Sequence, residues 1–286
     1  MHLQRRTALG TLSAAALAAV GPAAAAVMTS KVLDPVRDAA LINIKLRYRA
    51  DNGPLFWWMK GTKLGQVNAA MRPLFDMQVG TIARIAHKPD GTFDLTSLEV
   101  VFYTDLETGA RLRQWKNPYT EATVNVTHGP LGPETIAFKA DARKVEVPRE
   151  VGGAIIAGKF DSQASVVGDD VWAQTQSTVS VTQKDAAVPP FQVNEWSTFH
   201  GRAADVLAAN KPFIPATSHL QESTSWSKWM GMADRPGNLT ARCIGAKVKT
   251  YAEMPEKWRS LMAEAHPDIA ADPIGALDRP AARLDR

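Results

Sequence analysis

The stretch 98–128 constrains the fold most, because short apolar runs alternate along it with residues that favour turns. The runs 98–103, 112–115 and 123–128 are rich in β-branched and aromatic residues, which are typical of strands. Asp, Gly, Asn and Pro separate these runs. The stretch therefore predicts three strands joined by turns, with the large rings of Trp115 and Tyr119 at a proline corner.

The same pattern continues along most of the chain. Strict period-two alternation at 42–49 predicts a half-buried strand, and the alternation at 177–182 predicts another. Turn residues at 88–91 and 168–170 predict two hairpins. Further strands are expected at 55–60, 72–87, 135–139, 154–167, 171–182, 191–200, 223–230 and 239–250.

Helices are expected to be few. A short helix is predicted at 202–209 and a clearer one at 255–266, where proline opens the first turn and apolar residues share one face. Many strands with short connections predict a mainly β protein, a single antiparallel β-barrel or a barrel-like, lipocalin-like sandwich. We expect one domain over 27–270 and a flexible tail over 271–286.

Residues 1–26 are predicted to be an export leader. Arg5 and Arg6 precede a short apolar run, and small residues at Ala24 and Ala26 offer a cleavage site. The paired arginines resemble a twin-arginine signal, with a general secretory signal as the alternative. We therefore expect the twin-arginine export machinery as a partner and a periplasmic or secreted mature protein, cleaved near Ala26.

Charge and motifs exclude several classes of function. The net charge of +4 falls to about +2 once the two leader arginines are subtracted, too little for a nucleic-acid groove. The chain has no Gly-rich phosphate loop, no H-E-x-x-H and no G-x-S-x-G. Its histidines lie far apart, and its single cysteine, Cys243, is expected to be a small core residue. The sequence thus predicts no cofactor and no metal.

Tryptophan is the most informative residue type. Adjacent Trp57 and Trp58 cannot both face one side of a strand, so one of them must point out of the opposite face. The eight indoles are either core residues or the wall of a pocket for a small apolar or aromatic ligand. The predicted ligand-binding residues are Trp58, Tyr103, Trp115, Asn117, Glu195, Trp196, Trp226 and Trp229.

Three hypotheses for function stay open. The first is a carrier that binds an apolar ligand without chemistry. The second is a cofactor-free enzyme in which His200 and Glu222 form an acid–base pair inside the aromatic pocket. The third is a structural or interaction protein of the cell envelope, in which the tryptophans are core residues.

Three fragments together resemble a known family. They are 103–109 with the pattern Tyr-x-Asp-x-x-Thr-Gly, 115–120 with Trp-Lys-Asn-Pro-Tyr-Thr, and 226–237. Their order and spacing resemble the bacterial domain-of-unknown-function family 1838, over most of residues 40–270. Glu121 follows Thr120 where that family has Gly and then Glu. The resemblance implies export but no reaction and no catalytic residues.

Overall fold

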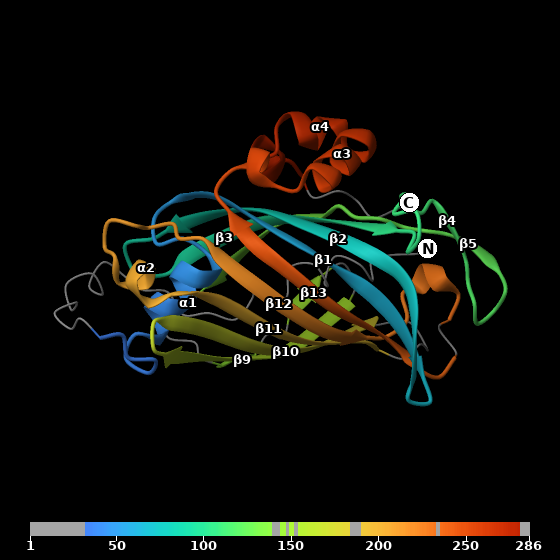
Figure 1. The fold of residues 1–286 in the computed structure, drawn as a ribbon, viewed down its shortest axis with the longest axis horizontal. Coiled ribbons are helices and arrows are strands. Elements are labelled where there is room, and N and C mark those ends of the chain that lie inside the picture. Colours follow the sequence, from blue (N-terminus) through green and yellow to red (C-terminus); the bar gives the residue numbers. More distant parts are fainter. Residues whose placement is uncertain are drawn as a thin grey trace.

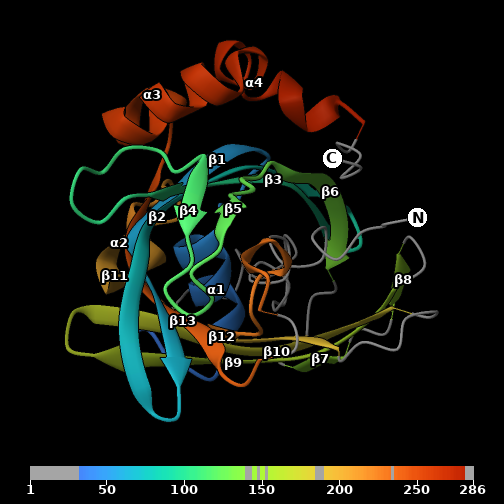
Figure 2. The ribbon, with the colours of Figure 1, turned by 90° about the vertical axis from the view of Figure 1, so that its right-hand side faces the viewer.

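The computed structural model describes residues 32–138, 144–146, 149–151, 154–183, 190–232 and 235–280, so the predicted leader lies outside it. One antiparallel sheet curls into a half-barrel (Figure 1, Figure 2). This confirms the predicted mainly β, barrel-like fold. The sheet is built from β1 (Gly53–Val67), β2 (Ala70–His87), β3 (Phe93–Thr104), β6 (Leu131–Phe138), β7 (Lys144–Glu146), β8 (Arg149–Val151), β9 (Ala154–Val167), β10 (Asp170–Gln183), β11 (Phe191–Arg202), β12 (Ala216–Thr224) and β13 (Asn238–Val248).

The sheet consists of two meanders joined at one seam. The strand order is β6-β3-β2-β1-β13-β12-β11-β10-β9-β7, with β8 also paired to β9. Strands β1 and β13 form the seam, in a register that runs from Phe56 opposite Val248 to Gln66 opposite Asn238. A separate two-stranded hairpin, β4 (Gln114–Lys116) and β5 (Thr123–Asn125), lies at one end of the curl (Figure 2). The seam therefore holds together parts of the chain that are far apart in sequence.

The segment 42–49 is not the predicted strand. It belongs to helix α1 (Ala39–Arg47), which lies inside the curl (Figure 2), at the end opposite the small hairpin (Figure 1). Both its apolar and its polar residues are buried, from Ile42 to Arg47. A helix that is buried on all sides does not need an apolar stripe along one face. The alternation of apolar and polar residues in this segment is therefore compatible with a helix and did not indicate a strand.

The two faces of the sheet bury different sets of side chains. Trp57 points into the concave side and packs against Phe199, at 5.2 Å between ring centroids. Trp58 points to the convex side and packs beneath the C-terminal helices. The expectation that these neighbours point to opposite faces is confirmed, as the period of a strand requires.

The convex face of β1, β2 and β3 is covered by the C-terminal helices (Figure 1). These are α3 (Glu256–Ala265), as predicted, then α4 (Pro267–Ala271) and a 3-10 turn, η4 (Gly275–Asp278). The Trp258 indole lies directly over Gly80, where a Cβ would come within 2.1 Å of the ring. Leu277 is buried in the same cluster, so the tail predicted to be flexible from 271 is packed as far as η4. No helix within the described ranges is long and apolar enough to cross a membrane.

The remaining helical segments are short. The predicted helix at 202–209 is α2 (Ala203–Leu207), and the predicted helix at 255–266 is α3. The predicted strand at 223–230 ends early, because β12 stops at Thr224 and the 3-10 turn η2 (Lys228–Met230) follows. A last 3-10 turn, η3 (Tyr251–Glu253), precedes α3. The loop around η2 folds back into the end of the curl that holds the small hairpin (Figure 2).

Candidate functional site: a polar belt on the concave side

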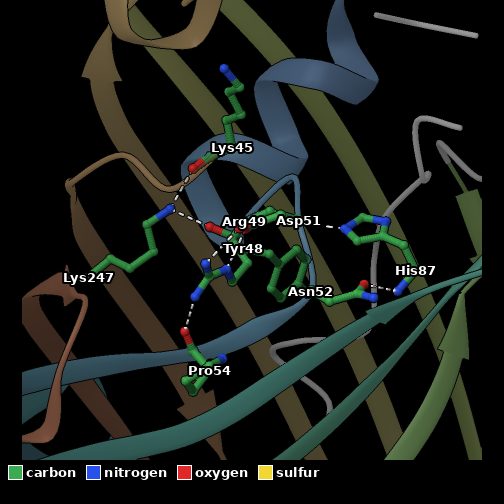
Figure 3. A network of polar contacts seen from close by, with 8 residues as sticks. All are labelled: Lys45, Tyr48, Arg49, Asp51, Asn52, Pro54, His87 and Lys247. Carbon is green, nitrogen blue, oxygen red and sulfur yellow. Dashed lines mark hydrogen bonds and ion pairs between the residues drawn. The ribbon is translucent and has the colours of Figure 1, made fainter. Parts of the chain in front are cut away.

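One end of the concave side is filled by α1 and the residues that hold it. The ammonium of Lys247 donates to the carbonyl oxygens of Lys45 and Tyr48, the latter at 2.6 Å (Figure 3). The Trp57 indole donates to the Arg47 carbonyl at 2.8 Å. These donors satisfy carbonyls that a helix leaves free at its C-terminus. Burial holds the pKa of Lys247 well below its ordinary value.

The opposite end is filled by an aromatic cluster, defined here as Phe75, Tyr103, Trp115, Trp226 and Trp229 with the apolar residues around them. Trp115 meets Trp229 edge-on at 5.8 Å, and Phe75 meets Tyr103 at 4.9 Å between ring centroids. Such tilted arrangements are the favourable ones for ring pairs. The cluster closes this end of the concave side with rings from β2, β3, the small hairpin and the loop around η2.

Asn117 fixes the small hairpin within this cluster. Its side chain is fully buried, and its amide nitrogen donates to the Met230 carbonyl at 2.8 Å. Its amide oxygen accepts from the backbone N–H of Tyr119 at 2.9 Å. A buried amide with partners on both atoms is a satisfied structural group. Asn117 therefore joins the hairpin to the loop around η2.

Between the two filled ends lies a belt of polar side chains on the concave side. One line of registered positions crosses the sheet through Lys63, Ala241, Glu222, Glu195 and Ser177. All five are buried, and antiparallel partners share a face. We define the polar belt as Lys63, Ser97, Glu99, Ser177, Glu195, Ser197, Ser218 and Glu222.

The strongest contact in the belt is an ion pair between Lys63 and Glu222, both at most 10% exposed at the side chain. Glu195 accepts a hydrogen bond from the Ser177 hydroxyl at 3.3 Å. Burial lowers the pKa of Lys63 to about 8, although the nearby acids raise it. Two carboxyl groups, an amine and a hydroxyl thus line up across β1, β12, β11 and β10, with Ala241 of β13 between Lys63 and Glu222.

Glu99 approaches the belt from β3, on the other side of the seam. Burial, together with the Glu195 charge, raises the pKa of Glu99 to about 8, and Lys63 acts in the opposite direction. Its side chain nevertheless keeps part of its surface accessible. Neutral Glu99 is therefore the prevailing form at neutral pH, deep on the concave side.

Two polar groups of the belt, on Ser218 and Glu99, have no hydrogen-bond or ion-pair partner among the described residues. The Ser218 hydroxyl is buried and makes no hydrogen bond. The Glu99 carboxyl forms no hydrogen bond and no ion pair with any described residue. Buried polar groups in folded proteins are nearly always paired, and leaving one unpaired costs about 1–3 kcal/mol. The belt thus carries hydrogen-bonding capacity that the fold itself does not use.

Cys243 borders the belt but offers no nucleophile. It is buried, and burial raises the pKa of its thiol to about 11 despite the opposing effect of Lys63. The thiolate is the reactive form, and it is scarce at neutral pH. The expectation of a small core cysteine is confirmed. Among the described residues, no group of three or more His, Cys, Asp and Glu side chains is arranged to hold a metal ion.

The structure divides the predicted ligand-binding residues into three groups. Five of them lie together at the aromatic end of the curl, and Glu195 lies in the polar belt. Trp58 and Trp196 lie on the convex side, Trp58 beneath the helices and Trp196 with 43% of its surface exposed. Trp58 and Trp196 therefore share no pocket wall with the tryptophans of the aromatic end. The five at the aromatic end are Tyr103, Trp115, Asn117, Trp226 and Trp229.

The predicted acid–base pair of His200 and Glu222 cannot act together. Glu222 faces the concave side, whereas His200 lies on the convex face, where it stacks on Trp172 at 5.1 Å and contacts Asp170 at 2.9 Å. Glu195 and His200 are separated by an odd number of positions on β11, so they point to opposite faces. The hypothesis of a cofactor-free enzyme is therefore left without its predicted acid–base pair.

Lys63, Glu99 and Ser218 were not predicted as site residues. Each lies at an inward position of a long strand, among apolar neighbours of the same face, such as Phe75 beside Lys63 and Val101 after Glu99. A charged residue at an apolar position of an alternating strand was the available signal. That signal can be used only when the concave face of the sheet is known, and the sequence does not reveal which face is concave.

Comparisons with known proteins give a family and no reaction. A family model described as "Protein of unknown function (DUF1838)" matches residues 53–282. No curated protein matches the chain. Among solved structures, two mutants of the Rh. blastica porin align with 69% of this chain and nearly all of theirs. Their TM-scores of 0.17 and 0.16, at 6% and 7% identity, are too low to support any conclusion on fold or function.

Proposed function

Since this chain belongs to the family described as protein of unknown function, DUF1838, we propose its function from its geometry: it binds a small molecule on the concave side of the half-barrel. The observation that carries the proposal is the unpaired hydrogen-bonding capacity of the polar belt, at Ser218 and Glu99. A bound ligand would supply the missing partners. A fold selected only for stability would replace Ser218 by an apolar residue at no cost.

The aromatic cluster supports a ligand with an apolar or aromatic part. Tyr103 belongs to this cluster and also borders the middle of the concave side, next to Met77 and Val101. It lies four residues from Glu99 on β3, on the same face and therefore about 13 Å away along the strand. Rings beside a few polar groups are the usual lining of small-molecule sites.

The proposal also places this binding outside the cytoplasm, because the sequence of residues 1–26 has the features of an export leader.

The third hypothesis, a structural or interaction protein, accounts for the aromatic cluster and for Asn117. It does not account for the unpaired groups of the belt, and this difference favours ligand binding.

The test exploits opposite effects on stability and on binding. We expect Ser218→Ala to raise the free energy of unfolding by about 1–3 kcal/mol, because it removes an unpaired buried hydroxyl. The same change should weaken the binding of compounds found by thermal-shift screening of small aromatic and apolar molecules. Ser165→Ala, on the convex side of β9, is the matched control and should change neither quantity.

Two outcomes would contradict the proposal. A Ser218→Ala protein that unfolds more easily would show that the hydroxyl has a structural partner. A screen in which no compound raises the melting temperature of the full chain would show that the concave side binds no such molecule.

A further inference from the structure

A histidine closes the chain segment that carries the small hairpin. We infer that His128 is an acid-sensitive latch: its neutral ring holds the segment 105–127 against β3, and its protonation loosens this segment and opens the aromatic end of the concave side. The inference rests on the proposed function, because it assigns control of access to that same site. The latch itself is a property of the fold and can be tested without a ligand.

The latch lies at the edge of β3, beyond the part that β6 covers. Strand β6 pairs with β3 from Phe93 to Glu99, where the register between the two strands ends. Further along the same strand, the backbone N–H of Tyr103 donates to the Nδ1 atom of His128 at 3.2 Å. Backbone amides in folded proteins are nearly always paired. The imidazole therefore takes the place of a strand at this point of the edge.

Three hydrogen bonds form a closed ring here. The Leu112 N–H donates to the Tyr103 carbonyl at 3.0 Å, and the Leu112 carbonyl accepts from Nε2 of His128 at 2.5 Å. The bond from the Tyr103 N–H to Nδ1 completes the ring. One imidazole nitrogen accepts and the other donates, so the histidine is neutral with its proton on Nε2. The ring of bonds joins the end of β3 to both limbs of the segment.

The surroundings of the latch are basic. The guanidinium of Arg111 lies 5.7 Å from the centroid of the Phe102 ring. The rings of His128 and His266 lie 6.0 and 6.1 Å from the same centroid, so three basic side chains surround one phenyl ring. His266, the residue before α4, donates from Nε2 to the Gly129 carbonyl at 3.0 Å. A charge on His128 would therefore be added beside the charge of Arg111.

The acids of the neighbouring helices are engaged by other groups. Glu264 of α3 accepts from Arg111 at 3.3 Å and from Arg113 at 3.0 Å. Asp268 of α4 is bonded to Arg279, and its charge favours protonation of His266. Within the described part of the chain, no carboxylate forms an ion pair with the latch. A protonated latch would therefore have no counter-charge at contact distance.

Protonation of His128 breaks the closed ring of bonds. A doubly protonated imidazole has no acceptor, so the Tyr103 N–H loses its partner. The Tyr103 ring contacts both the His128 ring and the Trp229 indole, each at 5.8 Å between centroids, so the change reaches the aromatic cluster directly. His266 differs, because its bond to the Gly129 carbonyl uses a donor that remains when the ring is protonated. Only His128 therefore acts as a latch.

The direction of the pH effect follows from the same surroundings. Burial, with the charges of Arg111 and His266, lowers the pKa of His128, although the Leu112 and Val101 carbonyl oxygens oppose this effect. The open segment therefore takes up a proton at higher pH than the closed one does. The closed state is fully stable above about pH 6.5 and loses stability as the pH falls below this value.

The segment held by the latch closes the proposed site. It carries β4, β5, Trp115 and Asn117, and its strands lie at the end of the curl (Figure 2). Lys257 of α3 also holds it, by an exposed bond to the Gly109 carbonyl at 2.6 Å. The buried contacts of Trp115 and Asn117 remain when the latch is broken. Acid therefore raises the fraction of molecules with an open segment and leaves the sheet folded.

Hydrogen exchange measured by mass spectrometry on the full chain tests the latch, with rates corrected for the intrinsic effect of pH. We expect the protection of peptides from 105–127 to fall between pH 6.5 and 5.5 by up to about tenfold, while β12 and β13 keep theirs. His128→Asn keeps an acceptor near the Nδ1 position, and His128→Gln keeps a donor near the Nε2 position. Both variants should remove the pH dependence, whereas His219→Asn, at an exposed position of β12, should preserve it.

A second measurement connects the latch to the site. Compounds that raise the melting temperature in the thermal-shift screen are titrated by isothermal titration calorimetry at pH 7.5 and 5.5. We expect their affinity for the parent protein to fall at pH 5.5, by up to about tenfold per unit below pH 6.5, because the open segment removes Trp115 from the site. Affinity for His128→Asn should change much less.

The outcomes separate the latch from the proposed function. Equal protection of 105–127 at both pH values, or an unchanged pH dependence in both His128 variants, would overturn the inference. If compounds bind and their affinity does not follow the opening of the segment, the latch does not control the site and the inference is wrong. If the segment opens in acid as expected while no compound binds at either pH, the latch stands and the proposed function fails.

Discussion

The two faces of the sheet bury side chains of different kinds. On the convex face, α3 packs into a continuous apolar cluster, and the Trp258 indole N–H finds the Val100 carbonyl at 3.4 Å. On the concave face, apolar residues fill the two ends, while the middle holds the charged groups of the belt and the unpaired Ser218 hydroxyl beside a small apolar cluster around Met77 and Val101. The comparison teaches that the convex side stabilises the fold, whereas the middle of the concave side costs stability that only another role can explain.

The largest effect should come from the convex side. Trp258→Ala removes a fully buried indole and leaves a cavity above Gly80, so we expect a loss of about 3–5 kcal/mol in the free energy of unfolding. Urea unfolding followed by circular dichroism measures this loss. Ligand binding by the folded fraction should be unchanged. A loss below about 1 kcal/mol would show that the helices are not a structural part of the fold.

The ion pair of the concave belt should come next. Lys63→Met leaves the Glu222 carboxylate buried without its partner, and we expect a loss of about 3 kcal/mol. The double variant Lys63→Met/Glu222→Leu removes both charges and should recover most of that stability, because paired burial of charges is nearly neutral overall. If the double variant is no more stable than the single one, the two groups are not coupled.

A smaller effect concerns pH. Folding raises the pKa of Glu99 from its ordinary value of 4.5 to about 8, so between these values the folded protein holds a proton that the unfolded chain has lost. The contribution of Glu99 therefore favours folding less and less as pH rises from about 4.5 to 8, by at most about 1.4 kcal/mol per unit. Glu99→Gln should flatten this part of the stability profile. A variant whose profile between pH 5 and 8 matches that of the parent would contradict the assignment.

The smallest effect is expected on the convex face at His200. This side chain is partly exposed, stacks on Trp172 and contacts Asp170, so His200→Ala should change the free energy of unfolding by about 0.5 kcal/mol or less. It should also leave ligand affinity unaltered in the calorimetric titrations. Loss of binding in this variant would contradict the placement of the binding site on the concave side.

The fold was largely predictable because its determinants are local. The strand runs, the hairpin turns at 88–91 and 168–170, and the helix at 255–266 all follow from short-range patterns. Helix α1 was not predictable in the same way, because its pattern is that of a strand and its conformation depends on being enclosed by the sheet. Local propensity gives way to tertiary surroundings in such a segment.

The candidate site was predictable only in part. The aromatic end was found because tryptophans are rare and conspicuous, and five of the eight predicted ligand-binding residues do lie together there. The polar belt was missed because Lys63, Glu99 and Ser218 come from three strands on both sides of the seam. The pairing of β1 with β13 brings the strands together, and no motif in the sequence predicts that pairing.

The seam between β1 and β13 also sets a requirement on how the chain folds. Lys247, near the end of β13, holds the carbonyl oxygens of Lys45 and Tyr48 across a separation of about 200 residues. Neither α1 nor β1 can acquire its final neighbours until the last strand has left the ribosome. Such a high contact order predicts slow folding, with the N-terminal meander exposing the edge of β1 in the meantime. A truncation before residue 238 would leave that edge permanently open.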